Sequence, residues 1–180
     1  MNSGTFAEIA EIGGIKYKGS VQFYVSGKLA YATLFEPTRI NGLLFRDVLT
    51  FDREGFLLRG NLAEPTERYG AHFKAQLVSL FRDGTIENGV IDRSTLPITE
   101  KRSCDFSSEW AVGHSLHARE AQFFDGGKIQ SGILVSDCRI WSPDGRSYYD
   151  FDPGYWVELN ESGRLLKQEK LGIQLPGLAD

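Results

Sequence analysis

Apolar and polar residues alternate along five segments of the chain, and each segment runs into a short polar turn that ends in glycine. In the first, Val21 and Phe23 alternate with polar neighbours, Gly27 closes the turn, and Leu29 follows two positions later. A period of two places the apolar side chains on one face of a β-strand, and glycine supplies the positive φ that a short hairpin loop needs. The pattern therefore predicts five β-hairpins. Their turn glycines are Gly27, Gly55, Gly84, Gly127 and Gly163.

The hairpins belong to a longer repeat. Ten residues of the first unit recur in kind 28 positions later, among them Gly27 as Gly55 and Pro37 as Pro65. Self-similarity at a fixed offset is typical of repeat proteins, in which each unit packs on its neighbours. The fifth unit departs from the pattern at Gln168, as a terminal capping unit would. We assign units to residues 12–39, 40–68, 69–94, 119–140 and 149–171, an insertion to residues 95–118, and a single domain to residues 1–180.

The second strand of each hairpin carries two apolar residues five positions apart, such as Leu57 and Leu62. In a regular strand this odd spacing would point them to opposite faces of the sheet. A small residue lies between the two in four of the units. These residues are Ala32, Gly60, Gly89 and Gly132. Because glycine inside a strand marks a bulge or a bend, we expect a kink at this point. Either both apolar residues then reach one core, or the strand crosses from one sheet to another.

The fold class that follows is all-β. The five hairpin units form either a twisted open sheet or a closed barrel or sandwich, since closure removes the exposed edges that an open sheet must protect. The repeated region has no helical stripe of apolar residues. Two brief helices are expected elsewhere, at residues 5–12 and 107–118.

The units resemble a repeat of uncharacterised bacterial proteins, in which an apolar-x-Phe-Tyr strand precedes glycine and an Ala-Glu-x-Thr step follows. The motif is carried here by Val21-Gln22-Phe23-Tyr24 and by Gly60-Asn61-Leu62-Ala63-Glu64-Pro65-Thr66. More loosely, the units are similar to MORN-type and antitoxin-type hairpin repeats. The resemblance covers most of residues 11–96 and part of residues 119–171. It implies sheets of β-hairpins and a binding or scaffolding role.

Composition and charge make some classes of binding partner less probable than others. Of the 180 residues, 41% are hydrophobic and 24% are charged, as in ordinary globular proteins. A net charge of −4, with Lys and Arg scattered, argues against a nucleic-acid partner. No stretch approaches the roughly 18 apolar residues of a membrane span. The N-terminus lacks the features of a signal peptide, so the expected location is the cytoplasm, or outside the cell if a leader precedes the sequence.

The two cysteines, Cys104 and Cys138, lie in different parts of the repeat. They could pair as a disulfide, but free thiols are the expectation for a cytoplasmic protein. Cys104 could also act as a nucleophile with His114 as its base. An unreactive thiol is favoured over this catalytic role, because nothing in the sequence brings the two side chains together.

The insertion at residues 95–118 concentrates titratable side chains, and insertions in repeat proteins form loops that often carry function. On a helical turn, His114 and His117 would share one face and could bind a metal. A third ligand could come from Asp105, Glu109 or Glu120. No His-Glu-x-x-His or Cys-x-x-Cys motif accompanies the two histidines. Ordinary surface histidines are therefore favoured, and we expect neither a metal nor a cofactor.

Aromatic residues mark a second candidate region. Trp141, Tyr149 and Tyr155 are interleaved with acids and turn residues, and Trp110 lies in the insertion. Exposed Trp and Tyr make recognition surfaces for proteins or flat ligands, although packing is the favoured role here. The segment Pro143-Asp144-Gly145 also predicts an extra hairpin, in which residues 140–141 face residues 148–149.

These observations support a binding or scaffolding module for an unknown protein or small-molecule partner, able to self-associate through a sheet edge as a homo-oligomer. The alternative is a small enzyme or ligand-binding β-barrel whose site lies at residues 95–118, near the aromatic segment. A structure without a concave pocket beside the insertion would remove the support for the alternative.

Overall fold

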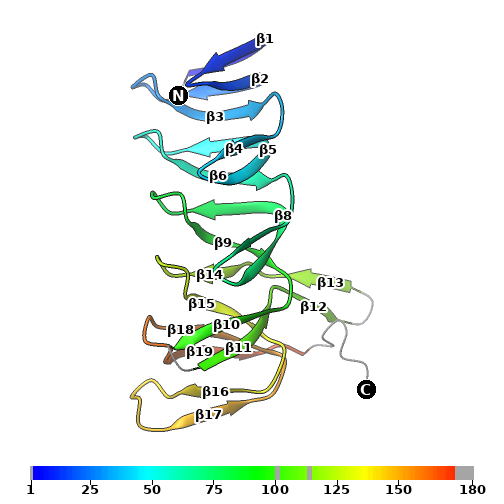
Figure 1. Ribbon diagram of the computed structural model, residues 1–180, viewed down its shortest axis with the longest axis vertical. Coiled ribbons are helices and arrows are strands. Elements are labelled where there is room, and N and C mark those ends of the chain that lie inside the picture. Colours follow the sequence, from blue (N-terminus) through cyan, green and yellow to red (C-terminus); the bar gives the residue numbers. More distant parts are fainter. Residues whose placement is uncertain (1, 100–101, 113–114, 173–180) are drawn as a thin grey trace. The chain divides into compact units, whose positions relative to one another are not determined.

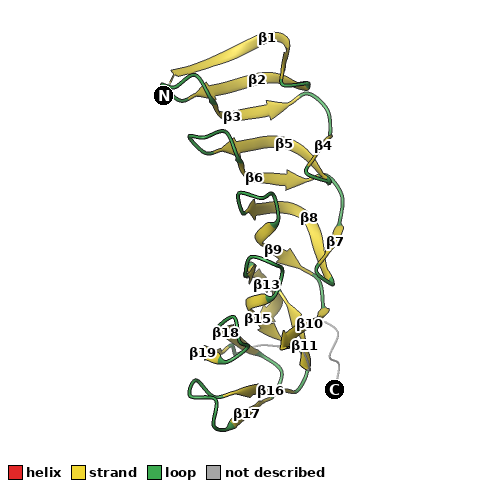
Figure 2. Cartoon of the chain, turned by 60° about the vertical axis from the view of Figure 1, so that its left-hand side comes forward, coloured by secondary structure: helices red, strands yellow, loops and turns green. Residues whose placement is uncertain are grey.

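The computed structural model describes residues 2–99, 102–112 and 115–172, and these form strands, turns and loops without a helix (Figures 1 and 2). The all-β prediction is therefore confirmed. The chain separates into two compact units. The first contains the residues up to Thr66 together with Ala75–Ile86, and the second contains Glu67–Lys74 together with the residues from Glu87 onward.

The first unit is an antiparallel ladder with the order β1-β2-β3-β5-β6-β8, to which the short β4 adds beside β5. Its strands are β1 (Asn2–Ile12), β2 (Ile15–Phe23), β3 (Leu29–Leu34), β4 (Thr38–Ile40), β5 (Leu43–Phe51) and β6 (Leu57–Leu62). Three strands have residues in both units: β7 (Thr66–Arg68), β8 (Ala71–Leu80) and β9 (Ile86–Ile91).

The second unit has a ladder with the order β9-β14-β15-β18-β19, from which further hairpins branch. The ladder strands are β14 (Ala121–Phe123), β15 (Ile129–Leu134), β18 (Tyr155–Leu159) and β19 (Leu165–Lys170). The insertion supplies β10 (Ser94–Thr99), β11 (Arg102–Ser107), β12 (Glu109–Val112) and β13 (Ser115–Ala118). A last hairpin consists of β16 (Cys138–Trp141) and β17 (Tyr148–Phe151).

The five predicted turns are present with the glycines where the pattern puts them. In the second turn, the Asp52 amide donates to the Phe56 carbonyl at 2.9 Å and the Gly55 amide donates to the Asp52 carbonyl at 3.1 Å. The same two bonds recur in the other four turns. All five glycines have a φ between 74° and 95°. This left-handed backbone is the reason for glycine at that position.

The predicted irregularity of the second strand is also present, but it lies nearer the turn. In β6, Thr50 faces Arg59 while the next residue of β5, Phe51, faces Leu57, so Leu58 is an extra, bulged residue. The bulge cancels the odd spacing, and Leu57 and Leu62 are both buried. Of the two alternatives, the one in which both apolar residues reach one core is therefore correct for this strand.

Gly60 is required by the packing of the core. A Cβ at Gly60 would lie 2.6 Å from a ring carbon of Phe45, which is completely buried on β5. In the second unit the same relation holds between Gly132 and Phe106, where the distance would be 3.0 Å. A large ring therefore fills the space that the missing side chain leaves, and these rings belong to the cores of the two units.

Three expectations are corrected. The strands do not close into a barrel: within the described residues β1, β10 and β19 each pair with a single neighbouring strand. The helix expected at residues 5–12 is wrong, because β1 satisfies its backbone by pairing with β2. The helix expected at residues 107–118 is wrong for the same reason, since β12 and β13 pair with each other.

Candidate ligand-binding site

The insertion at residues 95–118 forms two hairpins, β10–β11 and β12–β13. In the second hairpin Trp110 faces His117 across the ladder, so the helical turn that would have aligned two histidines is absent. His114 lies outside the described residues, as do the side chains of Trp110 and His117. Among the side chains that the structure describes, no group of three or more His, Cys, Asp and Glu residues could hold a metal ion.

Glu109, another candidate from the insertion, is an ion-pair partner. Its carboxylate accepts a hydrogen bond from the Lys74 ammonium at 2.7 Å, and Asp92 lies 3.2 Å from the same nitrogen. The hydrogen bond to Glu109 raises the pKa of Lys74 above its ordinary value. The carboxylate therefore neutralises a half-buried lysine and joins the start of β12 to β8.

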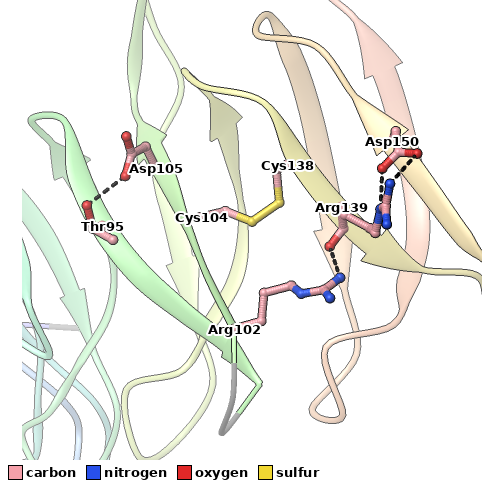
Figure 3. The surroundings of a disulfide bond; sticks show 7 residues. All are labelled: Thr95, Arg102, Cys104, Asp105, Cys138, Arg139 and Asp150. Carbon is pink, nitrogen blue, oxygen red and sulfur yellow. Dashed lines mark hydrogen bonds and ion pairs between the residues drawn. A yellow bond between two sulfur atoms is a disulfide. The ribbon is translucent and has the colours of Figure 1, made fainter.

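Cys104 and Cys138 form a disulfide, so the expectation of two free thiols is wrong (Figure 3). Their Cα atoms are 5.8 Å apart, and both residues are buried. Because a disulfide sulfur has no thiolate, the role of Cys104 as a nucleophile is excluded in this state. The bond joins β11 of the insertion to β16 of the last hairpin.

The hairpin β16–β17 has the predicted turn, and in its register Ile140 faces Tyr149 and Trp141 faces Tyr148. The rings of Trp141 and Tyr148 are stacked, with their centroids 3.6 Å apart. In the turn, the Asp144 carboxylate accepts a hydrogen bond from the Ser142 hydroxyl at 2.6 Å, and this bond lowers the pKa of Asp144.

A cavity of about 520 Å³ lies beside this stack. It is lined by Thr99, Arg102, Lys128, Trp141, Tyr148, Glu161 and Ser162. The lining residues come from the insertion, from the turns that precede β15 and β19, and from the hairpin β16–β17. The insertion and the aromatic segment, both of which the sequence singled out, therefore meet at one concave surface.

Two interactions of Arg102 fix one wall of the cavity. Its guanidinium donates to the Arg139 carbonyl at 2.9 Å (Figure 3) and lies 4.8 Å from the centre of the Tyr148 ring. Arg139 itself is paired with Asp150 by two hydrogen bonds. The hydrogen bond from Arg139 lowers the pKa of Asp150, so this pair stays ionised. The insertion thus holds the last hairpin by a disulfide, a hydrogen bond and a cation–π contact.

Another part of the lining depends on a turn glycine. Gly163 has a φ of 74°, and a Cβ at this position would collide with the Ile98 carbonyl of β10. The turn between β18 and β19 can therefore approach β10 closely only with glycine. This approach brings Glu161 and Ser162 beside Thr99, where all three residues line the cavity.

Asp105 stabilises the strand that carries Cys104. Its carboxylate accepts hydrogen bonds from the Thr95 hydroxyl at 2.6 Å and from the Arg93 guanidinium at 2.7 Å. These bonds, the one from Thr95 first, lower the pKa of Asp105. The bond between Thr95 and Asp105 ties β10 to β11 next to the disulfide (Figure 3).

Asp105→Asn is expected to lower the free energy of unfolding by about 1–2 kcal/mol at neutral pH, because it weakens two charge-assisted bonds. A carboxyl with a lowered folded-state pKa stabilises the fold above its unfolded pKa, near 3.9, and this stabilisation is lost as the pH falls further. The difference between wild type and variant should therefore shrink below that pH. Urea unfolding across the acid range measures it, with the exposed Asp125→Asn as control. A difference that grows on acidification would contradict the assignment.

Sequence reasoning found only part of the site. Trp141 lines the cavity, whereas the other two aromatic candidates of this segment, Tyr149 and Tyr155, are not lining residues. Tyr149 is 46% exposed on β17, and Tyr155 lies edge-on to Phe151 with ring centroids 5.2 Å apart. Lys128 and Glu161 were missed. They occupy turn positions at which the residue type differs among the five hairpins, so the sequence repeat gave no signal for them.

Ser108, which sequence reasoning also missed, connects the insertion to the ladder. It is completely buried, and its hydroxyl oxygen accepts hydrogen bonds from the backbone amides of Ile91 at 3.0 Å and Ala121 at 3.2 Å. A single side chain thus satisfies two buried amides where the strands β9 and β14 meet the insertion.

No protein-family model matches the chain, and neither a curated protein nor a solved structure is found to be similar to it. The resemblance to MORN-type and antitoxin-type repeats therefore stays a prediction from the residues of the hairpins. The described residues include no helix with the length and apolar character needed to cross a bilayer.

Proposed function

We propose that the protein is a binding module and that the cavity beside Trp141 and Arg102 is its ligand site. The observation that carries the proposal is the stacked pair of Trp141 and Tyr148 at the wall of a cavity of about 520 Å³. Small-molecule sites typically have roughly 300–1,000 Å³ and combine aromatic walls with a few polar groups. Hydroxyl, guanidinium, ammonium and carboxylate groups supply the polar part here.

The lining favours recognition over catalysis. Among the lining residues that the structure describes, Glu161 is the single carboxylate, and neither a histidine nor a cysteine is present. General acid–base hydrolysis of the glycosidase kind needs two carboxyl groups across the reacting bond. The set of groups is instead typical of a surface that holds a polar ligand against aromatic rings.

The architecture supports the same role. Three of the described lining residues, Lys128, Glu161 and Ser162, lie in hairpin turns beside packed strands, and the others lie on the branching hairpins. Loops on a rigid scaffold are the common location of binding sites. In this proposal the β-hairpins position the ligand site.

Ligand-observed NMR with a defined panel tests the proposal: neutral and acidic monosaccharides, nucleoside monophosphates and free amino acids. At least one class should bind the wild type and bind Trp141→Ala at least about tenfold more weakly, because the variant removes the aromatic wall. Tyr149→Ala, on the same hairpin but outside the lining, is the matched control and should bind like wild type. Binding of no panel member, or equal binding by Trp141→Ala, would overturn the proposal.

A further inference from the structure

We infer that the ligand of this cavity is an acidic sugar, a pyranose ring that carries an anionic group. The inference rests on the proposed function and adds the class of ligand. It is carried by the charges, the aromatic stack and the hydroxyl groups that meet in the cavity.

The lining residues that the structure describes carry a net positive charge, in a protein whose net charge is −4. Arg102 and Lys128 contribute two positive charges and Glu161 one negative charge. The neighbouring Arg139 is compensated by Asp150 through their paired hydrogen bonds. The cavity is therefore a local positive site on an acidic protein, which favours an anion.

Arg102 is held in place for this role. The Tyr148 ring lies against its guanidinium, and one nitrogen donates to the Arg139 carbonyl. An arginine has five N–H donors, so this bond uses one of them. A planar guanidinium that is already positioned binds a carboxylate or phosphate with a smaller loss of side-chain entropy.

The remaining groups suit a hydroxylated ring. Trp141, which is stacked on Tyr148, supplies the aromatic ring against which the C–H face of a pyranose can pack. The hydroxyl of Ser162 both donates and accepts, and the carboxylate of Glu161 accepts hydrogen bonds from ligand hydroxyl groups. The carboxylate of Glu161 would repel a second anionic group. We therefore expect the part of the ligand that contacts Glu161 to be neutral and to carry hydroxyl groups.

The test measures the affinities of glucose, glucuronate, glucose 6-phosphate and adenosine monophosphate by NMR titration. Glucuronate should bind at least about tenfold more tightly than glucose, and Arg102→Gln should remove most of this preference. Glucose 6-phosphate separates a preference for phosphate from one for carboxylate, and tighter binding of either anionic sugar than of glucose supports the inference. Added salt should weaken the anionic sugars more than glucose, since screening acts on the charged contact.

Three outcomes separate the inference from the proposed function. If glucose and glucuronate bind equally and both need Trp141, the ligand site stands and the acidic sugar is wrong. If adenosine monophosphate binds more tightly than either anionic sugar and needs Trp141, the class of ligand is again wrong. If binding of every compound is unchanged in Trp141→Ala, the proposed site itself fails. Lys167→Gln, which changes a lysine that is not a lining residue, controls for the loss of one positive charge.

Discussion

Replacing both Cys104 and Cys138 with serine is expected to lower the free energy of unfolding by about 4 kcal/mol. The disulfide closes a loop between residues 34 positions apart, and the chain-entropy relation for a loop of this length gives about that value. All three tryptophans lie in the second unit. Tryptophan fluorescence during guanidinium unfolding therefore reports on the unit that holds the disulfide.

The same substitution should disturb the ligand site. The hairpin β16–β17 is a separate two-stranded sheet, and the disulfide joins it covalently to β11. Without this bond, the wall that contains Trp141 keeps the hydrogen bond and the cation–π contact of Arg102 and the backbone bridge between Trp141 and Arg164, but it loses its covalent link to β11. Treating wild type with a thiol reductant should reproduce the result, and the reductant should leave the double variant unchanged. Equal unfolding midpoints for oxidised wild type and double variant would contradict the expectation.

Phe45→Ala is expected to cost about 3–5 kcal/mol of folding free energy in the first unit. The ring is completely buried and fills the space above Gly60, so its removal leaves a cavity beside a residue without a side chain. Because the first unit contains no tryptophan, hydrogen exchange of the β5 and β6 amides is the suitable measurement. Phe35→Ala is the control: this ring is 38% exposed, and its loss should cost less than about 1 kcal/mol.

A second pair of variants tests the packing relation itself. Gly60→Ala alone should destabilise the unit, because its Cβ would overlap the Phe45 ring. In combination with Phe45→Leu, which removes part of the ring volume, the cost should be smaller than the sum of the two single costs. Additive costs would show that Gly60 is needed for a reason other than the ring.

The sequence predicted those features that depend on residues close together in the chain, namely the turns, the extra hairpin and the strand irregularity. The turn glycines appear at the predicted positions, because a left-handed backbone in a hairpin excludes most other residues. The extra hairpin at residues 140–149 follows from a turn sequence in the same way. The odd spacing of Leu57 and Leu62 predicted an irregular strand, and the structure contains a bulge at Leu58.

Features that depend on distant parts of the chain were not predictable. The cysteines are 34 positions apart, and no local pattern brings their strands together. The insertion was expected to contain a helix, but its backbone is satisfied by strand pairing that a single sequence does not reveal. The cavity combines residues of four separate segments, and only Trp141 among them had a signal strong enough to be chosen.

Some residues that line the cavity lie in turns, apart from the buried residues of the strands, and this separation affects how the ligand specificity of the protein can evolve. Lys128, Glu161 and Ser162 occupy hairpin turns, and none of the three is buried. Substitutions at these three positions do not change the packing of the strands. They can therefore alter the preference for one ligand over another without loss of the fold. We therefore expect that a directed search for new specificities would find its productive variants in these turns, and its non-folding variants beneath the rings of Phe45 and Phe106.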